Sequence, residues 1–302
     1  MSETQGTLAL EPAAPGAPAA AGRSEGYWAN VAKRLRRDKV TLFFGLVLLA
    51  VFLSAILAPW IAPADPYATS MLRRLKPIGT PGYPLGADEL GRDMLTRLLY
   101  GGRLSLLMGL LPVVNATVIG CVLGLVAGFF GGRVNMAIMR TMDVFYAFPS
   151  VLLAIAISGA LGAGVVNTVV SLTIVFVPPI TRIAESVTTR VRRLDFVEAA
   201  RATGAGSLSV IRVHVLGNVL APVLIYASSL ISVSIILASG LSFLGLGATP
   251  PEPEWGLMLN TLRDAIFVSP WVAVVPGVMI FITSMSFNML SDGLRHAMDV
   301  RM

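Results

Sequence analysis

The sequence predicts an all-α integral membrane protein with six transmembrane helices. Hydrophobic residues make up 55% of the 302 residues and charged residues only 13%, whereas an average soluble protein contains roughly 25% charged residues. The apolar residues also gather into runs of the roughly 20 residues that one bilayer crossing requires. This composition is too apolar for a water-soluble core, so a lipid membrane is the expected surrounding.

The N-terminal part is polar enough to lie outside the bilayer. Residues 1–26 are rich in Pro, Ala and Gly and predict a disordered tail rather than a cleaved signal peptide. Residues 27–39 place Trp28 and Leu35 on one helical face and Lys33 and Arg36 on the other. That pattern predicts an amphipathic helix lying on an anionic leaflet. The alternative is a plain basic flank of the first span.

The remaining residues, 40–302, form one predicted six-helix transmembrane domain. Its spans are expected at residues 40–61, 104–130, 136–160, 165–186, 222–246 and 271–290. The third and fourth spans share an uncharged stretch that is long for one helix and short for two. We expect two helices there, because Gly159, Gly162 and Gly164 favour a turn between them.

The positions of the basic residues predict the orientation of the chain. Six spans place both termini and the basic segment 190–212 on the same side, together with most of the 23 Lys and Arg residues. Basic loops stay in the cytoplasm, so both termini are expected to be cytoplasmic. A five-span count would place segment 190–212 outside.

Two further patterns predict contacts between or within the helices. Small residues recur at every fourth position from Ala116 through Gly120 and Gly124 to Gly128, which predicts a face where another helix approaches closely. Two oppositely charged pairs are spaced three apart, Arg140 with Asp143 and Arg182 with Glu185. We expect each to form a local ion pair, in preference to a proton relay.

Composition and motifs argue against catalysis in this chain. Cys121 is the single cysteine and there are two histidines, so no disulfide framework, metal site or catalytic pair is predicted. The sequence has no phosphate-binding loop of the G-x-x-x-x-G-K-[ST] type, so we expect no catalytic or cofactor-binding residues here. The net charge of +6 is interpreted as basic cytoplasmic loops, with no nucleic-acid partner.

A polar segment at about residues 190–217 interrupts the apolar sequence. Asp195 is a candidate N-cap and Glu198 stands three residues on, so a short helix is predicted at 196–203, ending at Gly204. Its alanines leave a surface that could fit closely into a groove of a partner. An ordinary capped loop helix is the alternative.

The same segment resembles the EAA signature of ABC importer permeases. Glu198, Ala199 and Ala200 are followed by Gly204, His214 and Leu216, with Gly217 where the family usually has Pro. The resemblance implies a cytoplasmic coupling helix that docks into a groove of an ATPase subunit. The coupling residues that it implies are Glu198, Ala199, Ala200, Arg201, Gly204, His214 and Leu216.

Four other blocks resemble the C-type permease of dipeptide and oligopeptide importers. They are LGADELGRDMLTRLLYGGRLSL from Leu85, MRTMDVFYAFPSVLLA from Met139, LSFLGLGATPPEPEWGLML from Leu241 and FNMLSDGLRHAMDVRM from Phe287. The resemblance implies a type I ABC importer fold in a bacterial plasma membrane. It also implies a peptide substrate, a second permease subunit, an external binding protein and two ATPase subunits that use ATP and Mg²⁺.

Three alternatives stay open at the level of the sequence. A related ABC permease for nickel or another small solute would share these blocks. A secondary transporter or channel would have a similar composition, although no inverted repeat is evident. A membrane enzyme would need a nucleophile with a base, or a metal cluster.

Overall fold

The computed structural model describes residue 35 and residues 37–298. The predicted tail at residues 1–26 and most of the predicted interfacial helix at residues 27–39 lie outside this part of the chain. Within it the regular elements are helical. They are α2 (Lys39–Ile56), α3 (Ala58–Ile61), η1 (Met71–Arg73), α4 (Met94–Phe130), α5 (Gly132–Tyr146), α6 (Ser150–Leu161), α7 (Val165–Val191), α8 (Asp195–Ala202), α9 (Ser207–Val210), η2 (Ile211–Val215), α10 (Leu216–Phe243), α11 (Trp255–Thr261), η3 (Asp264–Phe267) and α12 (Pro270–Met298).

Among residues 37–298, five helices are long and apolar enough to cross a membrane, and a bent pair brings the number to six. The five are α2, α4, α7, α12 and the continuous run through α9, η2 and α10. The pair is α5 and α6, whose axes are bent by 88°. The predicted all-helical membrane fold is therefore confirmed, and six spans result when the pair counts as one.

The predicted third span, residues 136–160, is not one continuous helix but the bent pair α5 and α6. The chain leaves α5 after Tyr146 and enters α6 at Ser150, with Pro149 in the N-cap position at φ −55° and ψ 126°. Proline has no N–H and disfavours helical geometry at the residue before it. The break therefore follows from Pro149, in a stretch whose apolar composition is uninterrupted.

Helix α4 begins well before the predicted Leu104. The Asp93 carboxylate accepts a hydrogen bond from the Thr96 N–H at 2.8 Å and caps the helix. Arg97 lies in the first turn of this helix and is 2% exposed. Its guanidinium donates to the carbonyl oxygens of Pro66 at 3.0 Å and Pro251 at 3.3 Å, and these loop partners make its burial possible.

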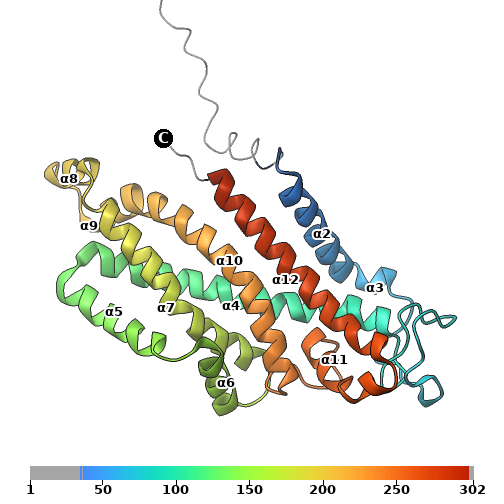
Figure 1. The fold of residues 1–302 in the computed structure, drawn as a ribbon. Helices are drawn as coiled ribbons and strands as arrows, with labels where there is room; N and C mark the ends of the chain where they lie inside the picture. The colour runs from blue at the N-terminus through green and yellow to red at the C-terminus, as the bar shows by residue number, and fades with distance from the viewer. Residues whose placement is uncertain (1–34, 36, 299–302) are drawn as a thin grey trace, which may run out of the picture.

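The predicted small-residue face of α4 is confirmed. Figure 1 shows α4 running the length of the bundle, and it packs against α7 along one side. A Cβ atom added to Gly124 would lie 2.4 Å from the Ala184 Cβ atom and 2.6 Å from the Thr181 carbonyl oxygen. Gly120 and Gly128 meet α7 in the same way. The two backbones are in direct contact, which only glycine permits.

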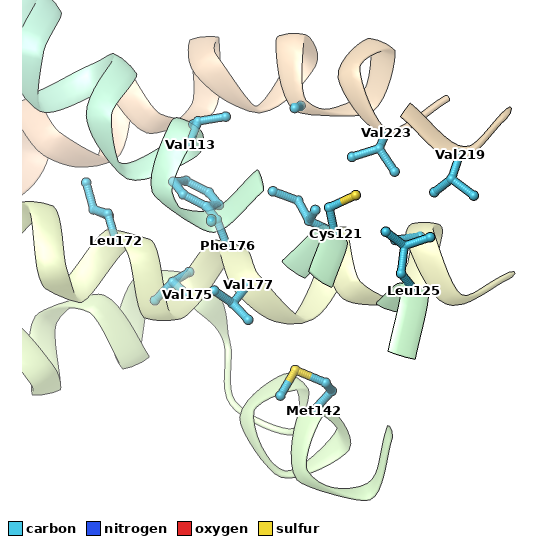
Figure 2. Close-up of a cluster of buried hydrophobic side chains, with 14 of the residues drawn as sticks. Val113, Cys121, Leu125, Met142, Leu172, Val175, Phe176, Val177, Val219 and Val223 are labelled. Carbon is cyan, nitrogen blue, oxygen red and sulfur yellow. The ribbon is translucent and has the colours of Figure 1, made fainter. Parts of the chain in front are cut away.

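The buried side chains form two clusters. One joins α4, α7 and α10 and extends into the segment that contains α8 and α9. Figure 2 shows part of it, with Cys121 and Leu125 of α4 near Val219 and Val223 of α10. The other cluster joins α2, α4, α11 and α12 around Trp255. The first cluster therefore connects the membrane helices to the predicted coupling segment.

One of the two predicted ion pairs forms differently. Arg140 lies 4.0 Å from Asp143, as its spacing predicts. Arg182, however, donates to Asp143 at 2.6 Å across the contact between α5 and α7, not to Glu185. The Glu185 carboxylate accepts from Asn135 at 2.6 Å and from Thr189 at 3.0 Å. Packing of α5 on α7 thus replaces the local pair with a contact between helices.

Candidate functional site

The predicted coupling segment lies at one end of the molecule. Figure 1 shows α8 and α9 beyond the ends of α5 and α7, far from α3 and α11 at the opposite end. The segment leaves α7 at Val191, forms α8 and α9, and continues through η2 into α10 without a break. A force on α8 would therefore reach both α7 and α10 along the backbone.

The predicted N-cap of α8 is wrong by one residue. Helix α8 begins at Asp195, and the Leu194 carbonyl oxygen accepts from the N–H groups of Val197 at 2.9 Å and Glu198 at 3.3 Å. No side chain caps the helix. Asp195 and Glu198 lie instead in its first turn, where carboxylates favour the positive end of the helix dipole.

The predicted end of α8 at Gly204 is confirmed in detail. The Gly204 N–H donates to the Arg201 carbonyl oxygen at 3.0 Å, and the Ala205 N–H donates to that of Ala200 at 3.1 Å. These two hydrogen bonds define a Schellman motif, which requires a left-handed residue after the helix. Gly204 supplies it with φ +85°.

Helix α8 has an inner and an outer face. Val197 is fully buried, and Ala200 packs against the same cluster. Glu198, Ala199 and Ala202 are exposed. Because residues three and four apart share a helical face, these three residues form one surface; Asp195, Phe196 and Arg201 are exposed elsewhere on the helix. We call Glu198, Ala199 and Ala202 the outer face of α8.

Phe129, near the C-terminal end of α4, anchors the segment. The Arg201 guanidinium lies over the Phe129 ring at 4.7 Å from its centre. The Arg192 guanidinium donates to the Phe129 carbonyl oxygen at 2.8 Å, where a positive charge also favours the negative end of the helix dipole. Arg201 is exposed, but its guanidinium lies against its own chain, and the anchor ties α8 to α4.

His214 and Leu216 follow α9 along the chain and are both half-buried. The His214 ring lies 6.2 Å from the Phe196 ring of α8, centre to centre. His214 belongs to η2, one turn of π-helix, and Leu216 begins α10 and packs against the buried cluster. Gly217 lies within α10, so the helix continues through the position where the family usually has proline.

The structure thus divides the seven predicted coupling residues by position. Glu198 and Ala199 lie on the outer face, Ala200 and Arg201 face the protein, and Gly204 ends the helix. Ala202, one of the alanines expected to fit a partner's groove but not among the seven coupling residues, completes the outer face; sequence reasoning missed the anchor made by Phe129 and Arg192. The i+3 and i+4 spacing from Glu198 could have indicated Ala202, whereas the anchor joins residues far apart in sequence. The coupling role of these residues stays a prediction.

At the opposite end, buried polar contacts hold the connecting loops together. The Glu254 carboxylate accepts from the N–H groups of Gly256 at 2.9 Å and Leu257 at 2.8 Å, and from the Ser105 hydroxyl at 2.9 Å. Nearby, burial raises the pKa of the Glu89 carboxyl, and the adjacent Asp88 carboxylate adds to this shift. Among the described residues no group of three or more His, Cys, Asp or Glu side chains is arranged to hold a metal ion.

Comparison with known proteins gives consistent matches over most of the chain. The family described as binding-protein-dependent transport system inner membrane component matches residues 120–302. The N-terminal transmembrane domain of oligopeptide transport permease C matches residues 26–77.

Curated relatives match over nearly their whole length. A di/tripeptide transport system permease protein of Pseudomonas aeruginosa is 43% identical over 85% of this chain and 86% of its own. A glutathione transport system permease protein of Pectobacterium atrosepticum is 38% identical over 91% of both chains. A dipeptide transport system permease protein of Alkalihalophilus pseudofirmus is 38% identical over 91% of this chain and 90% of its own. The chain therefore belongs to the family of inner-membrane permease components of binding-protein-dependent transport systems.

Proposed function

We propose that this chain is the permease subunit of an ATP-driven importer that carries di- or oligopeptides into the bacterial cytoplasm. Its relatives are named for dipeptides, di- and tripeptides and glutathione, which share a short peptide backbone. That shared chemistry supports a peptide cargo. The chain works with a second permease subunit, an external binding protein and two ATPase subunits that bind ATP and Mg²⁺.

The observation that carries the proposal is the outer face of α8. A short helix exposes Ala199 and Ala202 beside Glu198, while its other side is fixed by Val197 and by the contact between Arg201 and Phe129. Exposed alanines on a rigidly held helix suit insertion into a groove of a partner. We infer that this face docks into an ATPase subunit.

The proposed orientation follows from charge. The basic residues 190–212 lie in and beside α8, and basic loops stay in the cytoplasm, so the side of the membrane that carries α8 is assigned to the cytoplasm. ATP closure of the two ATPase subunits then moves α8. The backbone on either side of α8 and the Phe129 anchor transmit that movement to α7, α10 and α4. The transport path then closes to the outside and opens to the cytoplasm.

The test replaces Ala199 with Trp. Because Ala199 is exposed, the indole leaves the packing of this chain unchanged but fills the space that the ATPase groove would occupy. We expect normal membrane abundance, no ATPase captured with the tagged chain, and no uptake of labelled dipeptide. The matched control is Ala199→Ser, which keeps the small side chain and should retain both. Capture and uptake by Ala199→Trp would contradict the docking role of α8.

A further inference from the structure

The break between α5 and α6 borders a pocket of about 520 Å³. Residues 145–150 at the break form one wall, α7 contributes Phe176 and the pair Pro178 and Pro179, and α10 contributes Tyr226. The walls are largely aromatic and aliphatic. The volume falls within the roughly 300–1,000 Å³ that is typical of small-molecule sites.

The pocket lies halfway along the two helices that form its back wall. Helix α7 has 27 residues, or about 40 Å at 1.5 Å per residue, and Pro178 is its middle residue. Tyr226 and Leu230 lie in the same way near the middle of α10. Any solute that crosses the membrane along these helices passes this depth.

Two opposite charges stand at the rim of the pocket. The Arg182 guanidinium donates to the Asp143 carboxylate at 2.6 Å and lies 4.7 Å from the centre of the Tyr146 ring, which lines the pocket. The side chains of Arg182 and Asp143 are 47% and 44% exposed. Charges exposed to lipid at this depth are costly, so we expect this surface to face water or another subunit rather than hydrocarbon.

A second cavity, of about 570 Å³, continues from the first toward α8. Tyr226 lines both cavities. Arg190 and Arg295 line only the second. The two cavities follow the same side of α7 and α10, with the Tyr226 side chain between them.

We propose that the pocket at the break is a subsite of the transport path that holds a short zwitterionic peptide. The peptide carboxylate replaces Asp143 as the partner of Arg182, whose planar guanidinium can donate two parallel hydrogen bonds to a carboxylate. The peptide ammonium replaces Arg182 as the partner of Asp143, and a peptide side chain enters the aromatic pocket. In this structure the two side chains neutralise each other. The inference rests on the proposed peptide cargo.

The test measures binding without the external binding protein, whose own selectivity would otherwise dominate. The complex is captured through a tag on this chain, and binding of the dipeptide Ala-Phe and of Ala-Phe amide is measured calorimetrically. We expect Arg182→Gln to weaken Ala-Phe binding by about tenfold or more, since a charged hydrogen bond contributes about 1.5–3 kcal/mol. The wild type should prefer Ala-Phe to the amide, and the variant should not.

The matched control is Arg140→Gln. Arg140 is 81% exposed and lies 4.0 Å from Asp143, so it belongs to the same charge cluster, whereas the contact with the Tyr146 ring that lines the pocket is made by Arg182. Its removal should leave both affinities unchanged. Equal losses in the two arginine variants, or an unchanged preference for Ala-Phe in Arg182→Gln, would overturn the inference.

A second measurement requires no variant. A dipeptide that carries benzoylphenylalanine is bound to the wild-type complex, irradiated, and mapped by mass spectrometry. Labelling should fall within residues 145–150 or at Tyr226; labelling confined to other segments would also overturn the inference. Failure of the proposed function is a separate result, because it appears as a wild-type complex that takes up no dipeptide with ATP and binding protein present.

Discussion

Replacing Gly204 with Ala should weaken docking through backbone strain alone. Gly204 ends α8 with φ +85°, and a Cβ atom added there would meet nothing within 4 Å. The substitution therefore introduces no clash and removes no contact. An L-residue in the left-handed conformation costs about 1–2 kcal/mol, and the Schellman motif that positions α8 bears that cost.

Gly206 provides a control with the same substitution. It lies two residues on, has φ −64° and ψ 151°, and also borders open space. Alanine adopts this extended conformation freely, so Gly206→Ala should leave docking unchanged. Gly204→Asn should be intermediate, because asparagine tolerates the left-handed region better than alanine.

The assay titrates purified ATPase subunits onto the permease complex and measures dipeptide uptake in parallel. A strain of about 1–2 kcal/mol corresponds to about a 5- to 30-fold loss of ATPase affinity. We expect that loss for Gly204→Ala at normal membrane abundance. Affinities for Gly204→Ala and Gly206→Ala that agree within about twofold would refute the argument that the left-handed turn sets the position of α8.

Four other predictions concern topology, coupling, packing and pH. With Cys121 replaced, a cysteine at Leu72, 94% exposed, should react with an impermeant thiol reagent on intact cells, and one at Leu208, 80% exposed, should not; labelling at position 208 would reverse the orientation. Phe129→Leu should reduce ATP-driven uptake by removing the ring under Arg201, whereas Phe130→Leu, at an exposed neighbour, should not; equal effects would exclude the anchor. Gly124→Ala should lower the melting temperature, because overpacking costs about 1–3 kcal/mol, while Gly240→Ala, which meets nothing within 4 Å, should not; a stable Gly124→Ala would mean that α4 and α7 are farther apart. The pKa of Glu89 is raised, so its carboxylate destabilises the fold above that pKa, and this effect disappears as the pH falls. Glu89→Gln should therefore have a higher melting temperature than the wild type at about pH 8, and the difference should close toward about pH 4. A difference in melting temperature that widens on acidification would contradict the burial of Glu89.

The position of Glu254 shows why the structure changes the choice of labelling sites. In the six-span prediction the PPEPEW segment, residues 250–255, lies between the last two spans and therefore on the external side, where a thiol probe could reach it. The Glu254 carboxylate is instead buried and accepts hydrogen bonds at the start of α11. A cysteine at position 254 would therefore disturb the loop that it is meant to report on. Exposure depends on contacts with distant residues such as Ser105, which local sequence does not reveal.

Features that depend on local chemistry could be predicted from the sequence. The apolar runs located the spans, the repeat from Ala116 to Gly128 identified the face against α7, and Gly204 marked the end of α8. Each depends on side-chain size or polarity within a few residues. Pro149 was an equally local signal for the break after α5, but the uninterrupted apolar composition concealed it.

Features that depend on packing between distant segments could not be predicted. Arg97 can lie within α4 because the carbonyl oxygens of Pro66 and Pro251 accept its N–H groups and the Asp88 carboxylate lies 3.3 Å from its guanidinium. Arg182 pairs with Asp143 only because α5 lies against α7. The division of the coupling residues into outer and inner sets depends in the same way on Phe129, which no spacing rule connects to Arg201.

The most direct test of the proposed function is ATP-dependent uptake by a complex captured through this chain. The complex is reconstituted in proteoliposomes with the binding protein and a labelled dipeptide. We predict uptake with ATP and none without it, no uptake by the chain alone, and no uptake by what is captured through the Ala199→Trp chain, which should lack the ATPase subunits. Dipeptide uptake by the isolated chain, or by the complex without ATP, would contradict the assignment and indicate a channel or secondary transporter.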